Sequence, residues 1–241
     1  MLYGVVNKTM VINGLEKWYG RTSEADEILK IEEKQQKRKE AFSVLSKEIF
    51  GPTFIHPRTN IEWPHFLTSQ FGPRKVTALN DKKETQHYGI DLVPRDDKKN
   101  MAVTYGKNAN KNFPIKCVGD GKVVEVGFEK RGMGHYVIVE HLNGFRTVYG
   151  HLQNRGLPAK NSSIKKGDRL GYLGNSGKRT TGPHLHFELR TGTNQLSAVD
   201  PLSEIGTRHL ASITKPVRTV TEVAVNENHF QYFYNRYVGA H

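Results

Sequence analysis

Short apolar or alternating runs, interrupted by glycine, fill the chain from about residue 66 to 204. Three of them, CVGDGKVVEVGF, HYVIVEHLNGFRTVYGHL and HLHFELRTG, have the composition and two-residue period of strands. The tripeptides GDG and LNG and the dipeptide TG supply turn signals. This pattern predicts a mainly β fold built on an antiparallel sheet.

The run TTGPHLHFELR places two histidines one residue apart in such a strand. Because strand side chains alternate between faces, His184 and His186 share one face with Glu188 and Arg190, and the other face is apolar. The apolar face predicts contact with a core, so both imidazoles point to solvent or into a cleft. Taken alone, the pair fits the solvent-exposed face of a half-buried strand. A metal site therefore needs support from elsewhere in the chain.

Two further segments supply that support. In QHYGIDLV, Gly89 and the apolar neighbours of Asp91 favour a turn entering a strand, with His87 brought near Asp91 by the turn. In TVYGHLQ, His151 follows a strand and is expected to open a loop. Imidazole and carboxylate ligands without thiolates suit Zn²⁺, and two histidines plus one carboxylate with an open fourth position are typical of catalytic zinc.

Six motifs in order make the stretch from about Ser69 to Leu202 resemble the lysostaphin/LytM-type zinc endopeptidases, which cut peptidoglycan cross-bridges. The motifs are SQFGPR (69–74), HYGIDL (87–92), GDGKVVEVG (119–127), TVYGHL (147–152), KKGDRLGYLGNSG (165–177) and TTGPHLHFEL (180–189). The resemblance covers somewhat over half of the chain. It implies a groove domain on an antiparallel sheet.

The resemblance also implies a site. His87, Asp91 and His186 would bind one Zn²⁺, and His151 and His184 would be the catalytic pair beside it. Zinc is a Lewis acid that activates water, and the two histidines would orient or deprotonate that water, stabilise the oxyanion and protonate the leaving amine. The implied substrates are the peptide cross-links of bacterial peptidoglycan. A catalytically silent relative that binds peptidoglycan or activates amidases is the alternative, and the complete ligand set argues against it.

Other polar residues have structural interpretations. Glu188 either supports an imidazole or pairs with a nearby cation, and Arg74 is expected to stabilise the fold through a charge-assisted bond. His141 is expected to pack or hydrogen-bond at a strand end, and the single cysteine, Cys117, to pack. The remaining histidines lie outside the motifs: His56, His65, His135, His209, His229 and His241.

The composition divides the chain into three regions, and the resemblance makes the middle one the enzymatic domain. Residues 1–65 form an N-terminal extension with a polar helix at about 23–49, residues 66–204 the zinc endopeptidase domain, and residues 205–241 a C-terminal extension with an aromatic tail. The run EEKQQKRKE within the helix can bury little surface. Both extensions are expected to dock on a partner assembly or an anionic surface, with a structural role as the alternative. The polar run 95–112 is an insertion relative to the family and can rim the groove.

The formal net charge of +12 favours a polyanionic partner. No helix-turn-helix, RNP motif or zinc finger is recognisable, so nucleic acid is not predicted as the partner. The first twenty residues contain no apolar run typical of a secretory signal, and the sequence contains no transmembrane span. The resemblance implies action at the bacterial cell wall, outside the cytoplasm or in a virion. Because the usual signal or anchor of the family is not seen, a phage-encoded protein is one expected source.

Overall fold

The computed structural model describes residues 23–51, 54–55, 62–63, 65–76, 83–94 and 113–214. The 95–112 insertion, the aromatic tail and three of the histidines outside the motifs (His56, His229 and His241) lie outside these ranges. In the described chain, no helix is both long enough and apolar enough to cross a membrane.

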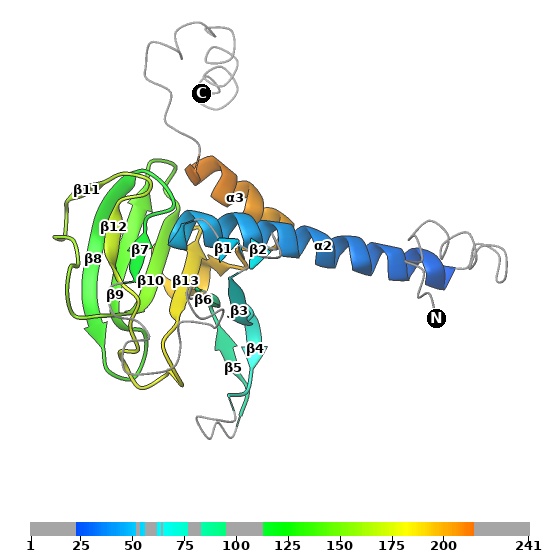
Figure 1. Ribbon diagram of the computed structural model, residues 1–241, viewed down its shortest axis with the longest axis horizontal. Helices are drawn as coiled ribbons and strands as arrows, with labels where there is room; N and C mark the ends of the chain where they lie inside the picture. Colours follow the sequence, from blue (N-terminus) through cyan, green and yellow to red (C-terminus); the bar gives the residue numbers. More distant parts are fainter. Residues whose placement is uncertain are drawn as a thin grey trace, which may run out of the picture.

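The described elements are mostly short strands, as the sequence predicts (Figure 1). The helices are α2 (Ser23–Phe50), the 3-10 helix η2 (Gln195–Ser197) and α3 (Glu204–Thr214). The strands are β1 (Phe54–Ile55), β2 (Glu62–Trp63), β3 (Phe66–Ser69), β4 (Gly72–Arg74), β5 (Thr85–His87), β6 (Ile90–Val93), β7 (Pro114–Lys116), β8 (Gly121–Glu129), β9 (Gly134–His141), β10 (Arg146–Leu152), β11 (Ser163–Ile164), β12 (Arg169–Tyr172), β13 (Leu185–Arg190) and β14 (Ala198–Val199).

One antiparallel sheet dominates the fold. Its strands follow the order β11-β8-β9-β10-β13-β6-β3, and β14 pairs with β13. Two-stranded ribbons are formed by β1 with β2, β7 with β12, and β4 with β5. The three strand runs singled out in the sequence become β8, β9 with β10, and β13, so the prediction of a mainly β, antiparallel fold is confirmed.

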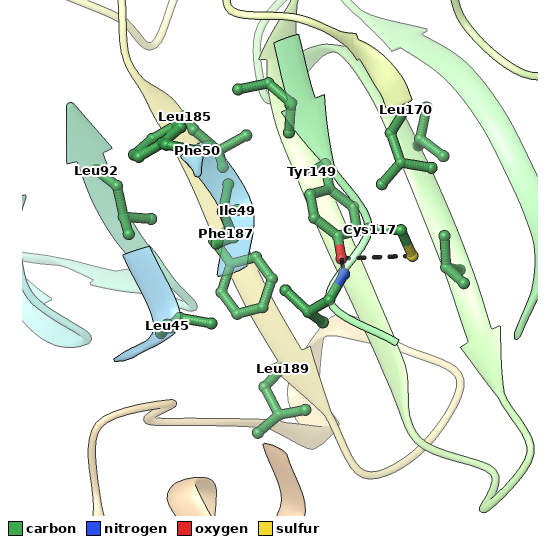
Figure 2. Close-up of a cluster of buried hydrophobic side chains, with 14 of the residues drawn as sticks. Leu45, Ile49, Phe50, Leu92, Cys117, Tyr149, Leu170, Leu185, Phe187 and Leu189 are labelled. Carbon is green, nitrogen blue, oxygen red and sulfur yellow. Dashed lines mark hydrogen bonds between the residues drawn. The ribbon is translucent and has the colours of Figure 1, made fainter. Parts of the chain in front are cut away.

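The apolar face of β13 packs into the main core, as Figure 2 shows. Leu185, Phe187 and Leu189 are fully buried beside Tyr149 of β10. Burying one such side chain contributes roughly 1.5–3 kcal/mol relative to exposure. The alternation predicted for HLHFELR is therefore confirmed. Its polar face is also buried, so His186 and its neighbours face the interior of a site and not bulk solvent.

Cys117 packs in the same core, as expected from the sequence. Its thiol contacts the hydroxyl of Tyr149 (Figure 2) and donates to the carbonyl oxygen of Gly119. Burial raises the pKa of the thiol to about 11, which keeps it protonated and unreactive at neutral pH.

The core also includes side chains from both flanking helices. Leu45, Ile49 and Phe50 at the C-terminal end of α2 are buried in it, as are Leu210 and Ile213 of α3. The N-terminal half of α2 extends away from the sheet, and nearly all of its side chains between residues 26 and 40 are exposed (Figure 1). The polar helix is confirmed, and its last two turns belong to the core. Helix α3 was not predicted from the sequence.

Candidate metal centre

Three strands bring the predicted ligands together. His87 ends β5, Asp91 lies in β6 opposite His186 of β13, and all three side chains are buried. Ile90 and Leu92, the neighbours of Asp91, face the main core, so the carboxylate lies on the other face of β6 as expected. These are the only three side chains in the described residues that form a group able to hold a metal ion.

The turn before β6 requires a glycine. A Cβ at Gly89 would lie 2.3 Å from the carbonyl oxygen of Phe187 and 2.9 Å from Cε1 of His186. The backbone between His87 and Asp91 can therefore approach β13 closely only because residue 89 has no side chain.

The atoms of the three residues that could bind a metal ion face one another. Nε2 of His87 lies 3.1 Å from Oδ1 of Asp91 and 3.0 Å from Nδ1 of His186, and that Nδ1 lies 3.0 Å from the same oxygen. Donor atoms at 2.0–2.1 Å from a tetrahedral zinc ion are separated by about 3.3 Å. The residues present therefore fit a zinc ion after a small expansion of the site.

A hydrogen bond on the far side of each imidazole fixes which nitrogen faces the centre. Nδ1 of His87 donates to the carbonyl oxygen of Gln70 at 2.7 Å, and Nε2 of His186 donates to Oε1 of Glu188 at 2.9 Å. Because those oxygens only accept, the protons lie on the outer nitrogens, and the inner nitrogens present lone pairs. Three acceptors then converge, so a proton or a metal cation must lie between them.

Two arginines hold the carboxylates of the site. Nη1 of Arg74 donates to Oδ2 of Asp91 at 2.7 Å and also contacts Oγ of Ser69, which confirms the expected charge-assisted bond. Arg190 donates to Oε2 of Glu188 from Nε at 2.7 Å and from Nη2 at 2.6 Å. Glu188 thus fulfils both alternatives left open by the sequence, since it supports His186 and pairs with a cation.

The expectation that His151 opens a loop is wrong. His151 lies within β10, at an irregularity where the β9–β10 register shifts between Tyr149 and Leu152, and its φ of 58° is in the left-handed region. Its N–H donates to the carbonyl oxygen of Met133 at 2.6 Å. A bulge of this kind turns a side chain out of the strand's alternation. A non-glycine residue held at positive φ is a strained conformation that often occurs at functional sites.

This bulge places His151 beside the other two histidines of the site. Its ring centroid is 4.6 Å from that of His184 and 6.0 Å from that of His186. Nδ1 of His151 donates to the carbonyl oxygen of Ser176 at 2.8 Å, and Nδ1 of His184 donates to that of Gly182 at 2.8 Å. Nε2 of His184 lies 3.6 Å from Oδ1 of Asp91. All five candidate residues from the sequence therefore lie in one cluster.

Burial, hydrogen bonds and neighbouring charges leave some groups of the site charged at pH 7 and others neutral. Burial alone would lower the pKa of His186, but hydrogen bonds to Asp91 and Glu188 raise it to about 9. Burial disfavours the charged form of Asp91, yet the hydrogen bonds from His186 and His87 hold its pKa well below its usual range. Burial, together with the charges of His184 and His186, lowers the pKa of His151 to about 3, and burial also lowers the pKa of His184. His151 and His184 are therefore neutral at pH 7, with Nε2 as an acceptor.

The groups that orient these rings were not predicted from the sequence. The carbonyl oxygens of Gln70, Ser176 and Gly182 hold His87, His151 and His184 respectively. All three residues lie inside quoted motifs, but residue type gives no signal for a role of the backbone oxygen. His141 behaves as expected at the end of β9, with Nδ1 2.9 Å from the carbonyl oxygen of Asp120 and Nε2 2.8 Å from Oγ1 of Thr147.

Comparison with known proteins identifies the segment that carries this cluster. Residues 85–201 match peptidase family M23. An uncharacterised metalloprotease of Haemophilus influenzae is 35% identical over 137 residues, which are 57% of this chain and 24% of the relative. The peptidoglycan DD-endopeptidase ShyC of Vibrio cholerae is 35% identical over 122 residues, which are 51% of this chain and 24% of the relative.

Among solved structures, the chain is similar to the catalytic domain of the antimicrobial peptidase lysostaphin from Staphylococcus simulans. That match has 24% identity and a TM-score of 0.44, and covers 62% of this chain and 92% of that domain. The chain spans about a quarter of the length of the two bacterial relatives. The family match contains five of the six motifs in full, and with them the cluster of His87, Asp91, His151, His184 and His186. Residues 85–201 of this chain are therefore a domain of peptidase family M23.

Proposed function

We propose that the protein is a zinc-dependent endopeptidase that hydrolyses peptide cross-links of bacterial peptidoglycan. One observation carries this proposal. The inner acceptor atoms of His87, Asp91 and His186 lie 3.0–3.1 Å from one another inside the M23 domain. The peptidoglycan DD-endopeptidase of Vibrio cholerae supports the substrate class. Under this proposal one Zn²⁺ binds per chain, and the protein acts at the bacterial cell wall.

A zinc ion in this site supplies a Lewis acid that polarises the scissile carbonyl and makes water more acidic. The proton transfers fall to His151 and His184. Because each Nδ1 donates its proton to a backbone carbonyl, each Nε2 can accept a proton from water and later return it to the leaving amine. The two rings lie only 4.6 Å apart, so both transfers take place within one small region of the site.

The surrounding residues hold this arrangement. Arg74 fixes Asp91, Glu188 fixes His186, and the Gln70 carbonyl fixes His87, so the inner atoms are oriented before any ligand arrives. The catalytic unit under this proposal comprises residues 66–204 together with the ends of α2 and α3 that complete its core.

The test is digestion of purified peptidoglycan by the full chain. We expect zinc-loaded protein to release new peptide amino termini at the cross-links, identified by mass spectrometry. Removal of the metal with a chelator should abolish the release, and added Zn²⁺ should restore it. Binding to peptidoglycan without any cleavage by the zinc-loaded protein would overturn the proposal and favour the catalytically silent alternative.

A further inference from the structure

Two loops beside the metal centre are rich in cations. The turn between β8 and β9 contains Lys130 and Arg131, and the loop that leads into β13 contains Lys178 and Arg179. Residues 129–133 and 174–183 contain these four cations and one carboxylate, that of Glu129. Both loops lie at the same end of the sheet, at the bottom of Figure 1.

Glycines pack the two loops tightly against each other. The N–H of Lys178 donates to the carbonyl oxygen of Lys130 at 2.9 Å. A Cβ at Gly177, where φ is +86°, would lie 2.8 Å from the carbonyl oxygen of Gly132 and 2.8 Å from the N atom of Gly134. This close approach requires residue 177 to be glycine. The cations of both loops are therefore gathered on one rim.

The rim adjoins His151 from two sides. The Ser176 carbonyl accepts from Nδ1 of His151 at 2.8 Å, and the Met133 carbonyl accepts from its N–H at 2.6 Å. Lys178 is two residues after Ser176, and Lys130 is three residues before Met133. An extended chain spans at most about 3.6 Å per residue. The backbones of Lys178 and Lys130 therefore lie within about 7 Å and 11 Å of the two residues that hold His151, which is the length of two to three residues of an extended substrate.

Three of these cations are not neutralised by a carboxylate from within the described residues. Lys130, Arg131 and Lys178 are exposed, and none of them forms an ion pair with a described carboxylate. The single acid of the two loops, Glu129, accepts from the N–H of Met133 at 3.3 Å. Arg179 contacts Oγ1 of Thr85 at 3.4 Å, which links the rim to β5 and so to His87.

We infer that this rim binds free carboxylates of the cross-link peptide, so that the substrate is an anionic cross-link and not a neutral glycine bridge. The inference rests on the proposed peptidase function and names its substrate class. The phosphates of a wall polymer would match the charge as well. Because the cations lie in the two loops that hold His151, their position favours the peptide that is cut over a polymer bound elsewhere.

The experiment compares two synthetic cross-linked peptides that differ only in whether the carboxylates next to the scissile bond are free or amidated. Each exposed ion pair contributes a factor of about 1.5–5. We therefore expect kcat/KM to be on the order of 10-fold higher for the free acid, and this preference to shrink as salt screens the charges. A triple variant, Lys130→Gln with Arg131→Gln and Lys178→Gln, should bring the ratio of the two kcat/KM values close to one.

A matched control removes three exposed lysines far from the rim: Lys30→Gln with Lys122→Gln and Lys160→Gln. It changes the net charge equally and should keep the wild-type ratio. Equal cleavage of both peptides by the wild type, or a ratio unchanged in the rim variant, would overturn the inference while leaving the proposed peptidase intact. Cleavage of a glycine bridge alone would also overturn only the inference. Cleavage of none of these substrates would count against the proposed function itself.

Discussion

Glu188 accepts a hydrogen bond of 2.9 Å from Nε2 of His186, on the side of the ring opposite the nitrogen that faces Asp91. The carboxylate is completely buried and is also held by Arg190 and by Nε2 of Gln195. Glu188 therefore fixes both the tautomer and the direction of the His186 ring without facing the metal centre itself.

Replacing Glu188 with Gln should weaken zinc binding by about 10–100-fold. The amide can still accept one hydrogen bond, but its neutral oxygen holds the imidazole less firmly and leaves Arg190 without its anionic partner. Competition with a chromogenic chelator measures the affinity. Glu140→Gln is the control, because Glu140 forms a comparable pair with Arg146 on the surface. Equal zinc affinity in both variants would show that Glu188 has no positioning role.

Much of the site could be predicted because its ligands lie on strands whose alternation is visible in the sequence. Asp91 lies between Ile90 and Leu92, and His186 between Leu185 and Phe187, so the apolar neighbours reveal the polar face. The prediction that these strands meet at one site came from the family motifs and not from the alternation. Strand pairing is a non-local property that a single strand does not encode.

The errors have the same physical origin. The position of His151 depends on a register shift between β9 and β10, which only the paired strands define. Helix α3 buries Gly206, Leu210 and Ile213, which share one helical face, but the helix has only 11 residues and Gly206 is a weak helix former. Its stability comes from packing on the domain and not from local propensity. The buried end of α2 was likewise hidden by the polar run that precedes it.

Changing His186 to Ala should remove most of the bound zinc, because one of only three protein ligands is lost. Elemental analysis of the purified variant measures the occupancy. His209→Ala serves as the control, since His209 packs against Phe145 and lies outside the group of potential ligands. Full occupancy in the His186 variant would show that the ligand set is wrong.

His184→Ala should behave in the opposite way and keep its zinc while losing most activity. Nε2 of His184 faces the centre, but His184 is not part of the group whose donor atoms converge. A general acid or base is typically worth about 10²–10⁴ in rate. His151→Ala is likewise expected to keep its zinc while losing most activity. Peptide hydrolysis at the wild-type rate by either variant, measured alongside zinc content, would refute its catalytic role.

Zinc binding should release about one proton at pH 7. In the metal-free fold the pKa of His186 is raised from 6.5 to about 9, so the ring holds a proton that zinc must displace. The apparent zinc affinity should therefore rise by about tenfold per pH unit up to about pH 9 and then level off. Calorimetry in buffers of different ionisation enthalpy counts the proton. Zinc binding with no proton release at pH 7 would contradict this assignment.

The same pKa shift makes a prediction for the stability of the metal-free protein. A raised folded-state pKa stabilises the fold fully below about pH 6.5, and this contribution is lost as the pH rises through 9. Metal-free protein should thus lose stability between these pH values, as measured by its melting temperature. His186→Asn cannot gain this proton and should show a flatter profile. Identical profiles would exclude His186 as the group responsible.

Two substitutions on α2 test whether its end belongs to the fold. Ile49 is fully buried in the main core, whereas Ile28 is 57% exposed on the same helix. Ile49→Ala should lower the free energy of unfolding by about 2–5 kcal/mol, through lost burial and the cavity left behind. Ile28→Ala makes the same chemical change in the same helix and should stay within about 0.5 kcal/mol of the wild type. Urea unfolding followed by circular dichroism measures both. If the two variants were equally stable, α2 would be a dispensable extension; a large loss confined to Ile49→Ala would place its last turns inside the catalytic unit.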